Sequence, residues 1–286
     1  MAARAALRGG QQPLVRVVAH GLDADPRRLG QHPDAQAGFS PWGSSYGHAH
    51  EHIRTDSRAW LDGWAWQQVA AQLTAAGHRA IPVTLGTASS DGLAEHTAQV
   101  SRVLAEQDEP VVLVGHSYGS FPMLAAADAA PERVARTVLI DAPLPEDGES
   151  LVDMVPEQRA TVTGELVRYP EVAWLDGGDL PAEIAEQLPQ RVPFWPARSM
   201  TEPIRLTGAF KNLPMTGIFC TLSGADLPLV RGLHATGAPR FAWLANPANR
   251  YFELPSGHCP MFSMPERLAE VLAAAARGEG EPLLGE

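Results

Sequence analysis

Cysteines, long apolar runs and targeting signals are scarce in this sequence. The 286 residues include two cysteines, Cys220 and Cys259, too few for a disulfide framework, so nothing requires an oxidising compartment. No window approaches the roughly 18 consecutive apolar residues that a membrane-spanning helix needs. The opening stretch MAARAALRGGQQPLVRVVAH also lacks the apolar core and the cleavage site of a signal peptide. We therefore expect a cytoplasmic protein without a membrane partner.

Basic side chains and cofactor motifs are scarce as well. Acidic residues outnumber basic ones by 33 to 22, and the net charge of −11 would repel nucleic acids and anionic lipids. The chain has no G-x-G-x-x-G, P-loop or zinc-ligand pattern, so we predict no cofactor. Its one histidine-rich run, with His48, His50 and His52, lacks the aspartate and the later ligands of a metallo-hydrolase, so we predict no metal site. The expected partner is a small molecule, and a homodimer is the one protein assembly that stays open.

From residue 60 onward the sequence alternates regularly between helix and strand patterns. Trp66, Val69, Ala70 and Leu73 fall at i, i+3, i+4 and i+7, which predicts a helix that Gly77 ends. The alternation predicts an α/β fold with a mostly parallel central sheet and helices on both faces. Apolar runs typical of buried strands occur at residues 78–85, 110–116, 134–142, 216–224 and 249–257.

Three stretches depart from this alternation. Residues 143–214 hold many prolines, acidic residues and short helical pieces, which predicts a small helical cap between two parts of the core, residues 58–142 and 215–277. Residues 1–57 carry five of the ten histidines and few aliphatic side chains, so they form an atypical N-terminal segment in which only LVRVVAHG suits a strand. Residues 278–286 are predicted to be a flexible tail.

The run VVLVGHSYGS places Gly115, Ser117 and Gly119 in G-x-S-x-G spacing between an apolar strand and a helix. This context indicates a nucleophile elbow, a strand-to-helix turn so tight that side chains at the glycine positions would clash. The turn lifts the serine hydroxyl above the sheet edge, at a helix N-terminus that favours developing negative charge. Ser117 is therefore the predicted nucleophile.

A serine nucleophile needs a base and a residue that orients the base. His258 lies on the loop after the last predicted strand, in the chain order expected for this mechanism, and is the predicted base. Asp141 ends the strand after the elbow, whereas Asp226 lies several residues into the loop after the next strand. We favour Asp141 as the acid, because active-site groups gather at the carboxyl edge of parallel strands, and keep Asp226 as the alternative.

Four stretches resemble the α/β-hydrolase superfamily, and within it the branch of plant methylesterases, hydroxynitrile lyases and bacterial esterase relatives. They are DGWAWQQVAAQLTAAGHRAIPVTL, VVLVGHSYGS, VLIDAPLPEDGES and LPSGHCPMFSMPERLAEVL. The resemblance implies an esterase that cleaves a small, largely apolar carboxylic ester. It also implies that the backbone N–H of Tyr118 forms half of an oxyanion hole, and we expect Trp64, Trp174 and Trp195 to line the substrate pocket.

Two features depart from the pattern of this branch. Its plant members carry the acid after the later strand, where this sequence has Ser223. In the family, a strand ending in His-Gly comes directly before the helix that begins with tryptophans, here Trp64 and Trp66, and the loop between them gives the second oxyanion donor. In this sequence IRTDSRAW stands in place of that strand and loop. Losing one such donor typically costs about 10²–10³ in rate.

Three explanations of the missing loop stay open. The family strand could be VRVVAHG, residues 15–21, followed by an insertion of a length that is uncommon in compact domains. The reading frame could be shifted, because HIRTDSR can be encoded so that a one-base shift reads TYVLIHG, directly before Ala59. In the third explanation the hole is lost, and the protein is a binding module on a hydrolase scaffold. Lyase activity is a further alternative; it usually needs a lysine near the triad, and the one lysine, Lys211, lies at the end of the cap.

Overall fold

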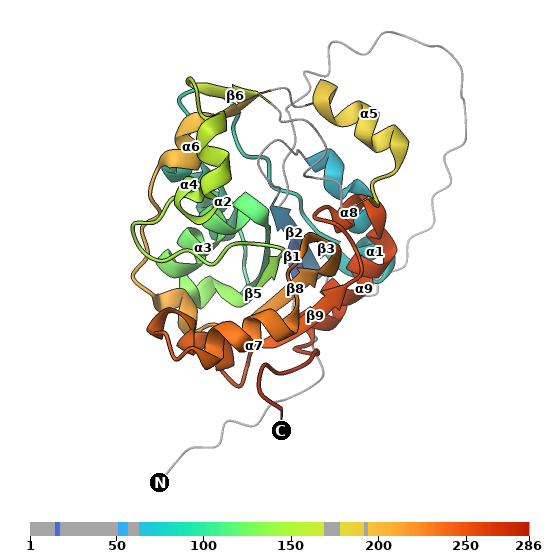
Figure 1. Ribbon diagram of the computed structural model, residues 1–286. Helices are drawn as coiled ribbons and strands as arrows, with labels where there is room; N and C mark the ends of the chain where they lie inside the picture. Colours follow the sequence, from blue (N-terminus) through green and yellow to red (C-terminus); the bar gives the residue numbers. More distant parts are fainter. Residues whose placement is uncertain (1–14, 18–50, 57–62, 169–177, 192–193, 286) are drawn as a thin grey trace, which may run out of the picture.

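A parallel sheet forms the centre of this protein (Figure 1). A computed structural model describes residues 15–17, 51–56, 63–168, 178–191 and 194–285. Neighbouring strands follow the order β3-β2-β4-β5-β8-β9, and each of these pairings is parallel. The predicted α/β fold with a mostly parallel sheet is confirmed. The strands are β1 (Val15–Val17), β2 (Glu51–Asp56), β3 (His78–Ala80), β4 (Val111–His116), β5 (Val134–Ile140), β8 (Met215–Cys220) and β9 (Arg250–Leu254).

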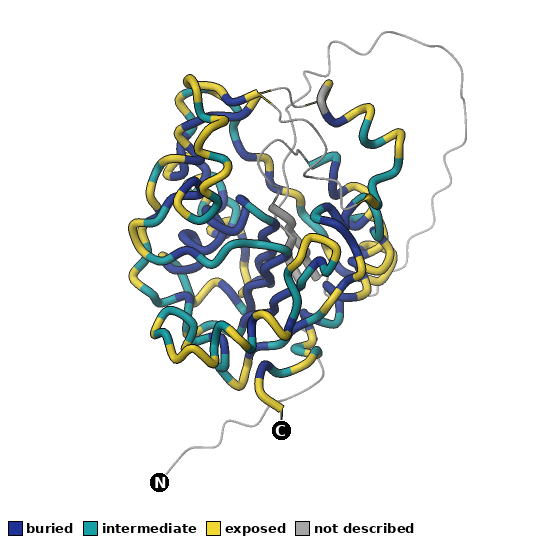
Figure 2. Tube along the Cα trace, viewed as in Figure 1, coloured by how far each residue is buried: buried dark blue, intermediate teal, exposed yellow. Residues whose placement is uncertain are grey.

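Helices cover both faces of the sheet. α1 (Gln67–Ala75) and α9 (Pro265–Ala276) pack together on one face, and α2 (Leu93–Ala105) and α3 (Ser120–Ala129) pack together on the other. α7 (Leu227–Ala235) follows β8 and contacts β9. Because both faces are covered, every residue of β4 is buried, and Figure 2 shows the buried chain running through the middle of the molecule.

The chain between β5 and β8 is the segment predicted as a cap. It carries β6 (Leu166–Arg168) paired antiparallel with β7 (Phe194–Pro196). Figure 1 shows α5 (Ala182–Arg191) apart from the other cap helices, on the side of α1. Among the described residues, the other α-helices of this part are α4 (Leu151–Met154) and α6 (Ala197–Thr201). α8 (Pro260–Ser263) follows β9.

The segment before the tryptophan helix differs from the sequence-based expectation. Residues 51–56, whose sequence has no strand pattern, form β2 between β3 and β4. β1 pairs with the same edge of β4, so that Leu113 is the register partner of both Arg16 and Arg54. A strand offers two edges for pairing, and β5 takes the other edge of β4. β1 and β2 are therefore alternative occupants of one position in the sheet.

The C-terminal residues pack against the core, which corrects the prediction of a flexible tail. Glu281 exchanges two backbone hydrogen bonds with Tyr251 of β9, at 2.8 and 3.0 Å. Arg231 of α7 donates to the carbonyl of Leu283 at 2.7 Å, and Leu283 itself is buried. Burial of the Leu283 side chain stabilises the packed tail. The sequence did not predict this packing, because most residues around Leu283 are polar or glycine.

Candidate active site

Ser117 stands at the end of β4, on the predicted elbow. Its backbone φ is +52°, in the left-handed region that most side chains avoid, as the sharp turn into α3 requires. Gly115 makes the turn feasible, because a Cβ at this position would lie 2.8 Å from the Cα of Ser120. The Ser117 side chain is thereby held at the wall of a cavity at the end of the sheet.

Hydrogen bonds connect Ser117, His258 and Asp141 in a row. The Ser117 hydroxyl lies 3.0 Å from Nε2 of His258, and Nδ1 of His258 donates to the Asp141 carboxylate. Asp141 directly follows β5 with a φ of +41°, a second left-handed residue at the carboxyl edge of a neighbouring strand. Burial alone would raise the pKa of Asp141, but hydrogen bonds from His258 and Ser223 bring it below its ordinary value. An ionised Asp141 fixes the His258 proton on Nδ1 and directs Nε2 toward the serine.

Asp226, the alternative acid, lies elsewhere. Its Oδ1 accepts a 2.7 Å hydrogen bond from the backbone N–H of Leu229, so it caps the N-terminus of α7. Ser223, which stands where the plant enzymes carry their acid, has its hydroxyl 2.7 Å from Oδ2 of Asp141 and 2.7 Å from the carbonyl of Cys220. A hydroxyl donates one proton, so it serves one of these acceptors at a time. The structure thus brings Asp141, and not Asp226, to the histidine.

Two side chains hold the backbone of the loop that carries His258. From the elbow, Nε2 of His116 donates to the carbonyl of His258 at 2.6 Å. From the cap segment, the carboxylate of Asp179 accepts the N–H of Gly257 at 2.7 Å. The peptide groups next to the histidine are therefore fixed both by the turn at Ser117 and by the cap.

Tyr118 follows Ser117, and its backbone N–H is the predicted oxyanion donor. Its hydroxyl lies 2.7 Å from Nδ1 of His96, and Nε2 of His96 lies 2.9 Å from the carbonyl of Gly86. A carbonyl can only accept, so Nε2 carries the proton and Nδ1 accepts from the tyrosine. Burial lowers the pKa of His96, which keeps the ring neutral in this arrangement. His96 thus fixes the side chain of the residue that carries the donor.

A cavity of about 730 Å³ lies against Ser117 and His258. This volume is within the range of small-molecule sites, about 300–1,000 Å³. Most of the wall is apolar, and Glu149, Asp153 and Arg240 add charged groups to it. The larger apolar side chains in the wall include Leu144, Leu151, Met154, Phe219, Leu233 and Phe241.

Trp64 and Trp195, predicted to line the pocket, do not line this cavity. Trp195 is fully buried and packs edge-on against Tyr118, with ring centroids 5.7 Å apart, so it supports the elbow. The Trp64 ring lies under the guanidinium of Arg191 from α5, 4.1 Å from the ring centroid, and so joins cap and core. Both rings therefore pack against other parts of the protein, whereas the sequence predicted that they would contact the substrate. Trp174 lies outside the described residues.

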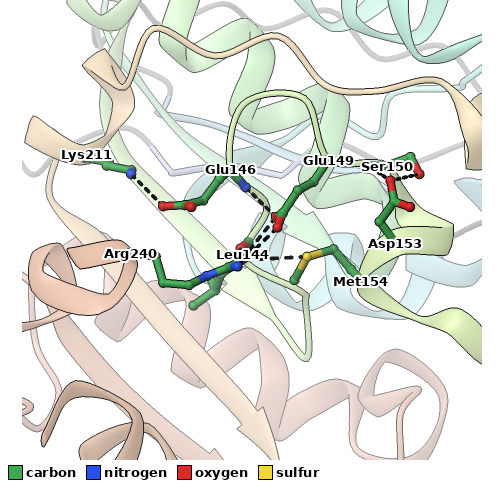
Figure 3. Close-up of polar contacts among 8 residues, drawn as sticks. All are labelled: Leu144, Glu146, Glu149, Ser150, Asp153, Met154, Lys211 and Arg240. Atoms are coloured by element: carbon green, nitrogen blue, oxygen red, sulfur yellow. Dashed lines mark hydrogen bonds and ion pairs between the residues drawn. The ribbon is translucent and has the colours of Figure 1, made fainter. Parts of the chain in front are cut away.

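Lys211 lies away from the catalytic candidates. Its Nζ is 3.7 Å from the carboxylate of Glu146 (Figure 3). It lines a separate cavity of about 280 Å³ whose wall includes none of the residues of the hydrogen-bonded row. The lysine that a hydroxynitrile lyase usually needs near its triad therefore has no counterpart here.

The structure also bears on metals, membranes and disulfides. The described part of the chain contains no group of three or more His, Cys, Asp or Glu side chains suited to a metal ion. Among the helices of that part, none combines the length and the apolar character needed to cross a bilayer. Cys220 and Cys259 are both buried thiols with no disulfide between them. Burial, helped by the charge of Asp141, raises the pKa of Cys220, so this thiol stays protonated.

Sequence reasoning missed Asp179, His96 and Arg240 as residues of the site. Each acts through a partner 22 to 91 positions away in the chain, which no local pattern encodes. His96 alone gave a signal, because it lies on the apolar face of α2 between Leu93 and Val100. A histidine buried at such a position needs hydrogen-bond partners.

Comparisons with known proteins agree with this geometry. The sequence profile of the alpha/beta hydrolase family matches residues 17–271. A carbendazim hydrolyzing esterase from Nocardioides sp. (strain SG-4G) is 28% identical over 233 residues, which cover 76% of this chain and 96% of that protein. Methylesterase 3 of Arabidopsis thaliana is 28% identical over 159 residues, which cover 48% of this chain and 60% of the plant protein.

Solved structures show the same fold. An extracellular alpha/beta-hydrolase from a Paenibacillus species superposes with a TM-score of 0.62 at 20% identity, over 76% of this chain and 95% of that one. Polyneuridine aldehyde esterase superposes with a TM-score of 0.59 at 18% identity, over 76% of this chain and 96% of that one. The structures show the fold, and the sequence matches to the bacterial esterase and the plant methylesterase confirm the resemblance to the branch that includes the plant enzymes. With a family profile that spans most of its length, the chain belongs to the alpha/beta hydrolase family.

Proposed function

We propose that this protein is a serine esterase in which Ser117, His258 and Asp141 act as nucleophile, base and orienting acid. The observation that carries the proposal is their hydrogen-bonded row on the wall of a cavity of substrate size. Membership of the family, with relatives named esterase and methylesterase, makes the chain a carboxylic ester hydrolase. The row supplies the groups that such a reaction needs.

The chemistry follows from the order of the three side chains. Oγ of Ser117 attacks the carbonyl carbon of the ester while Nε2 of His258 takes the hydroxyl proton. The carboxylate of Asp141 stabilises the imidazolium that forms. His258 then gives this proton to the departing alcohol, which leaves an acyl group on Ser117. A water molecule, deprotonated by the same imidazole, releases the carboxylic acid and restores the serine.

The negative charge on the carbonyl oxygen needs hydrogen-bond donors. The backbone N–H of Tyr118, at the N-terminal end of the elbow helix, is the donor that we assign. Its side chain is anchored by His96, which limits movement of the peptide group. The second donor falls to the loops after β1 or β2, and both loops lie outside the described residues.

The cavity supports a small and largely apolar ester as the substrate. Its wall is dominated by aliphatic and aromatic side chains, which favour apolar groups on either side of the ester. Its volume of about 730 Å³ leaves room for both an acyl and an alcohol part of moderate size.

Hydrolysis of p-nitrophenyl butyrate tests the proposal. We expect Ser117→Ala to reduce the rate by about 10⁴-fold or more. Ser101→Ala, on α2 and outside the cavity wall, is the matched control and should keep the wild-type rate. Hydrolysis that survives Ser117→Ala would refute the serine mechanism. If the wild-type protein hydrolyses neither this ester nor a wider set of esters, the scaffold serves as a binding module instead.

A further inference from the structure

An ion pair interrupts the apolar wall of the cavity. Arg240, in a short 3-10 helix at Pro239–Ala245, donates from Nη1 and Nη2 to the two carboxylate oxygens of Glu149, each at 3.1 Å (Figure 3). The two side chains are 30% and 27% exposed, and both line the cavity that contains Ser117. Partly buried charges lose hydration, so a bidentate pair at this position needs compensating contacts.

Arg240 has N–H donors that none of the described residues uses. A guanidinium carries five N–H groups. Glu149 accepts one N–H from Nη1 and one from Nη2. The second N–H of Nη2 donates to the carbonyl of Leu144 at 3.3 Å, and the sulfur of Met154 lies 3.9 Å from the same nitrogen. Within the described residues, neither Nε nor the second N–H of Nη1 makes a hydrogen bond. Two N–H groups therefore remain for a ligand in the cavity.

The charges around these donors favour an uncharged ligand group. Glu149 neutralises Arg240. Asp153 also lines the cavity, and hydrogen bonds from Ser150 lower its pKa, so it is ionised. Arg159 pairs with Asp153 at 2.7 Å but does not line the cavity. With Asp141 of the hydrogen-bonded row included, a carboxylate on the substrate would face three carboxylates and one guanidinium in this cavity, whereas a neutral oxygen would meet no such repulsion.

We propose that Arg240 is a specificity-determining residue that donates a hydrogen bond to an uncharged oxygen of the substrate. The substrate class is then a neutral ester whose apolar chain carries an ether or ketone oxygen several atoms from the reacting carbonyl. Plain hydrocarbon esters and half-esters of dicarboxylic acids are the poorer substrates. The inference rests on the proposed function, because Ser117 fixes the reacting carbonyl in the same cavity.

Matched esters in which one methylene is replaced by oxygen test this inference. p-Nitrophenyl hexanoate and p-nitrophenyl 4-methoxybutanoate vary the acyl side, and hexyl acetate and 4-methoxybutyl acetate vary the alcohol side. Each pair is also made two atoms longer. The measured quantity is the kcat/KM of the oxygen-containing ester divided by that of its hydrocarbon partner. We expect Arg240→Met to lower this ratio about 10- to 100-fold for the chains that reach Arg240, which is the loss expected for one hydrogen bond from a charged donor.

Two further variants complete the experiment. Arg267→Met removes an Arg–Glu pair of similar type, with Glu270, from the surface of α9 and should leave every ratio unchanged. Glu149→Gln leaves the Arg240 charge unbalanced, so mono-p-nitrophenyl glutarate should gain about tenfold in kcat/KM relative to p-nitrophenyl hexanoate. A ratio compares two substrates on the same folded molecules, so partial unfolding of a variant does not alter it.

The outcomes separate this inference from the proposed function. If Arg240→Met and the wild type give equal ratios for every pair, the role of Arg240 is refuted while Ser117-dependent hydrolysis still supports the esterase. If none of the esters is hydrolysed in a Ser117-dependent way, the proposed function fails and the inference fails with it. A lower ratio in Arg240→Met on one side of the ester supports the inference and shows which side of the ester reaches Arg240.

Discussion

Replacing Asp141 with asparagine should reduce the esterase rate far more than the same replacement at Asp226. Asparagine tolerates a left-handed backbone better than most residues, so the φ of +41° at this position is kept. Its amide carries no charge to balance an imidazolium. Its NH₂ group can also donate to Nδ1 of His258, which moves the imidazole proton to Nε2 and leaves no acceptor for the Ser117 hydroxyl.

The magnitude follows from this change of tautomer. A serine triad that loses its carboxylate in this way loses about 10⁴-fold in kcat, or about 5 kcal/mol of transition-state stabilisation. At Asp226, asparagine caps a helix about as well as aspartate, so the contact with Leu229 and the rate should both persist. Ser223→Ala removes one of the hydrogen bonds to Asp141 and should cost at most about tenfold.

The assay is the initial rate of p-nitrophenyl butyrate hydrolysis under saturating substrate, with a thermal melt of each variant. Both asparagine variants should melt close to the wild type. A large loss of kcat in Asp226→Asn together with wild-type kcat in Asp141→Asn would refute the assignment of the acid. It would also require the loop before α7 to rearrange, because Asp226 makes its hydrogen bond within that helix end.

Two further predictions concern residues outside the hydrogen-bonded row. Asp179→Ala should lower kcat about tenfold with little change in KM, because the N–H of Gly257 loses a charged acceptor. Asp179→Asn, which keeps an acceptor, should recover most of the rate, and equal losses in both variants would contradict a positioning role. Asp128→Ala should lower the free energy of unfolding by about 2–4 kcal/mol at neutral pH, because the backbone N–H groups of Thr207 and Phe210 lose their acceptor. Burial raises the pKa of Asp128, but these hydrogen bonds bring it below its ordinary value of 3.8. The stabilisation that Asp128 provides is therefore present above pH 3.8 and is lost as the pH falls through the lower pKa of the folded state. In urea melts, the difference in unfolding free energy between the wild type and Asp128→Ala should therefore shrink in acid.

The sequence predicted those parts of the fold in which each residue's role depends on its near neighbours. The period of α9 follows from the apolar face that contains Leu268 and Leu272, and the uniformly apolar β4 follows from burial on both sides. The elbow was predictable because a tight turn needs glycine beside the serine. Asp141 was predictable from its position at the very end of a strand.

Contacts between distant segments could not be predicted in the same way. Trp195 looked like a pocket residue because it is aromatic and lies in the cap, yet its burial against Tyr118 depends on how the cap folds back over α2. The pairing of Arg240 with Glu149 spans 91 residues, and neither residue has a local pattern that marks it. Residues 51–56 form a strand without any strand-like pattern, because their place is set by the open edges of β3 and β4.

Which of β1 and β2 holds their shared position decides where the proposed second oxyanion donor would lie. Both strands pair with Leu113 and Val114 of β4. If β2 holds the position, the donor comes from the residues that follow Asp56, where a one-base shift of the reading frame would restore His-Gly. If β1 holds it, the donor comes from the residues that follow Val17, and the long insertion is real.

Paired proline substitutions distinguish these two arrangements. Successive residues of a strand direct their N–H groups to opposite edges, so two adjacent prolines remove one hydrogen bond to β4 whichever way the strand faces. Arg54→Pro with Thr55→Pro should destabilise the protein by about 3 kcal/mol or more if β2 pairs with β4, and Arg16→Pro with Val17→Pro should then have little effect. The reverse result assigns the position to β1 and excludes a shifted frame, which the DNA sequence around codon 58 would check independently. Wild-type stability in both double variants would mean that neither segment pairs with β4, and the hydrolase would then have to form its oxyanion hole without a strand at this edge.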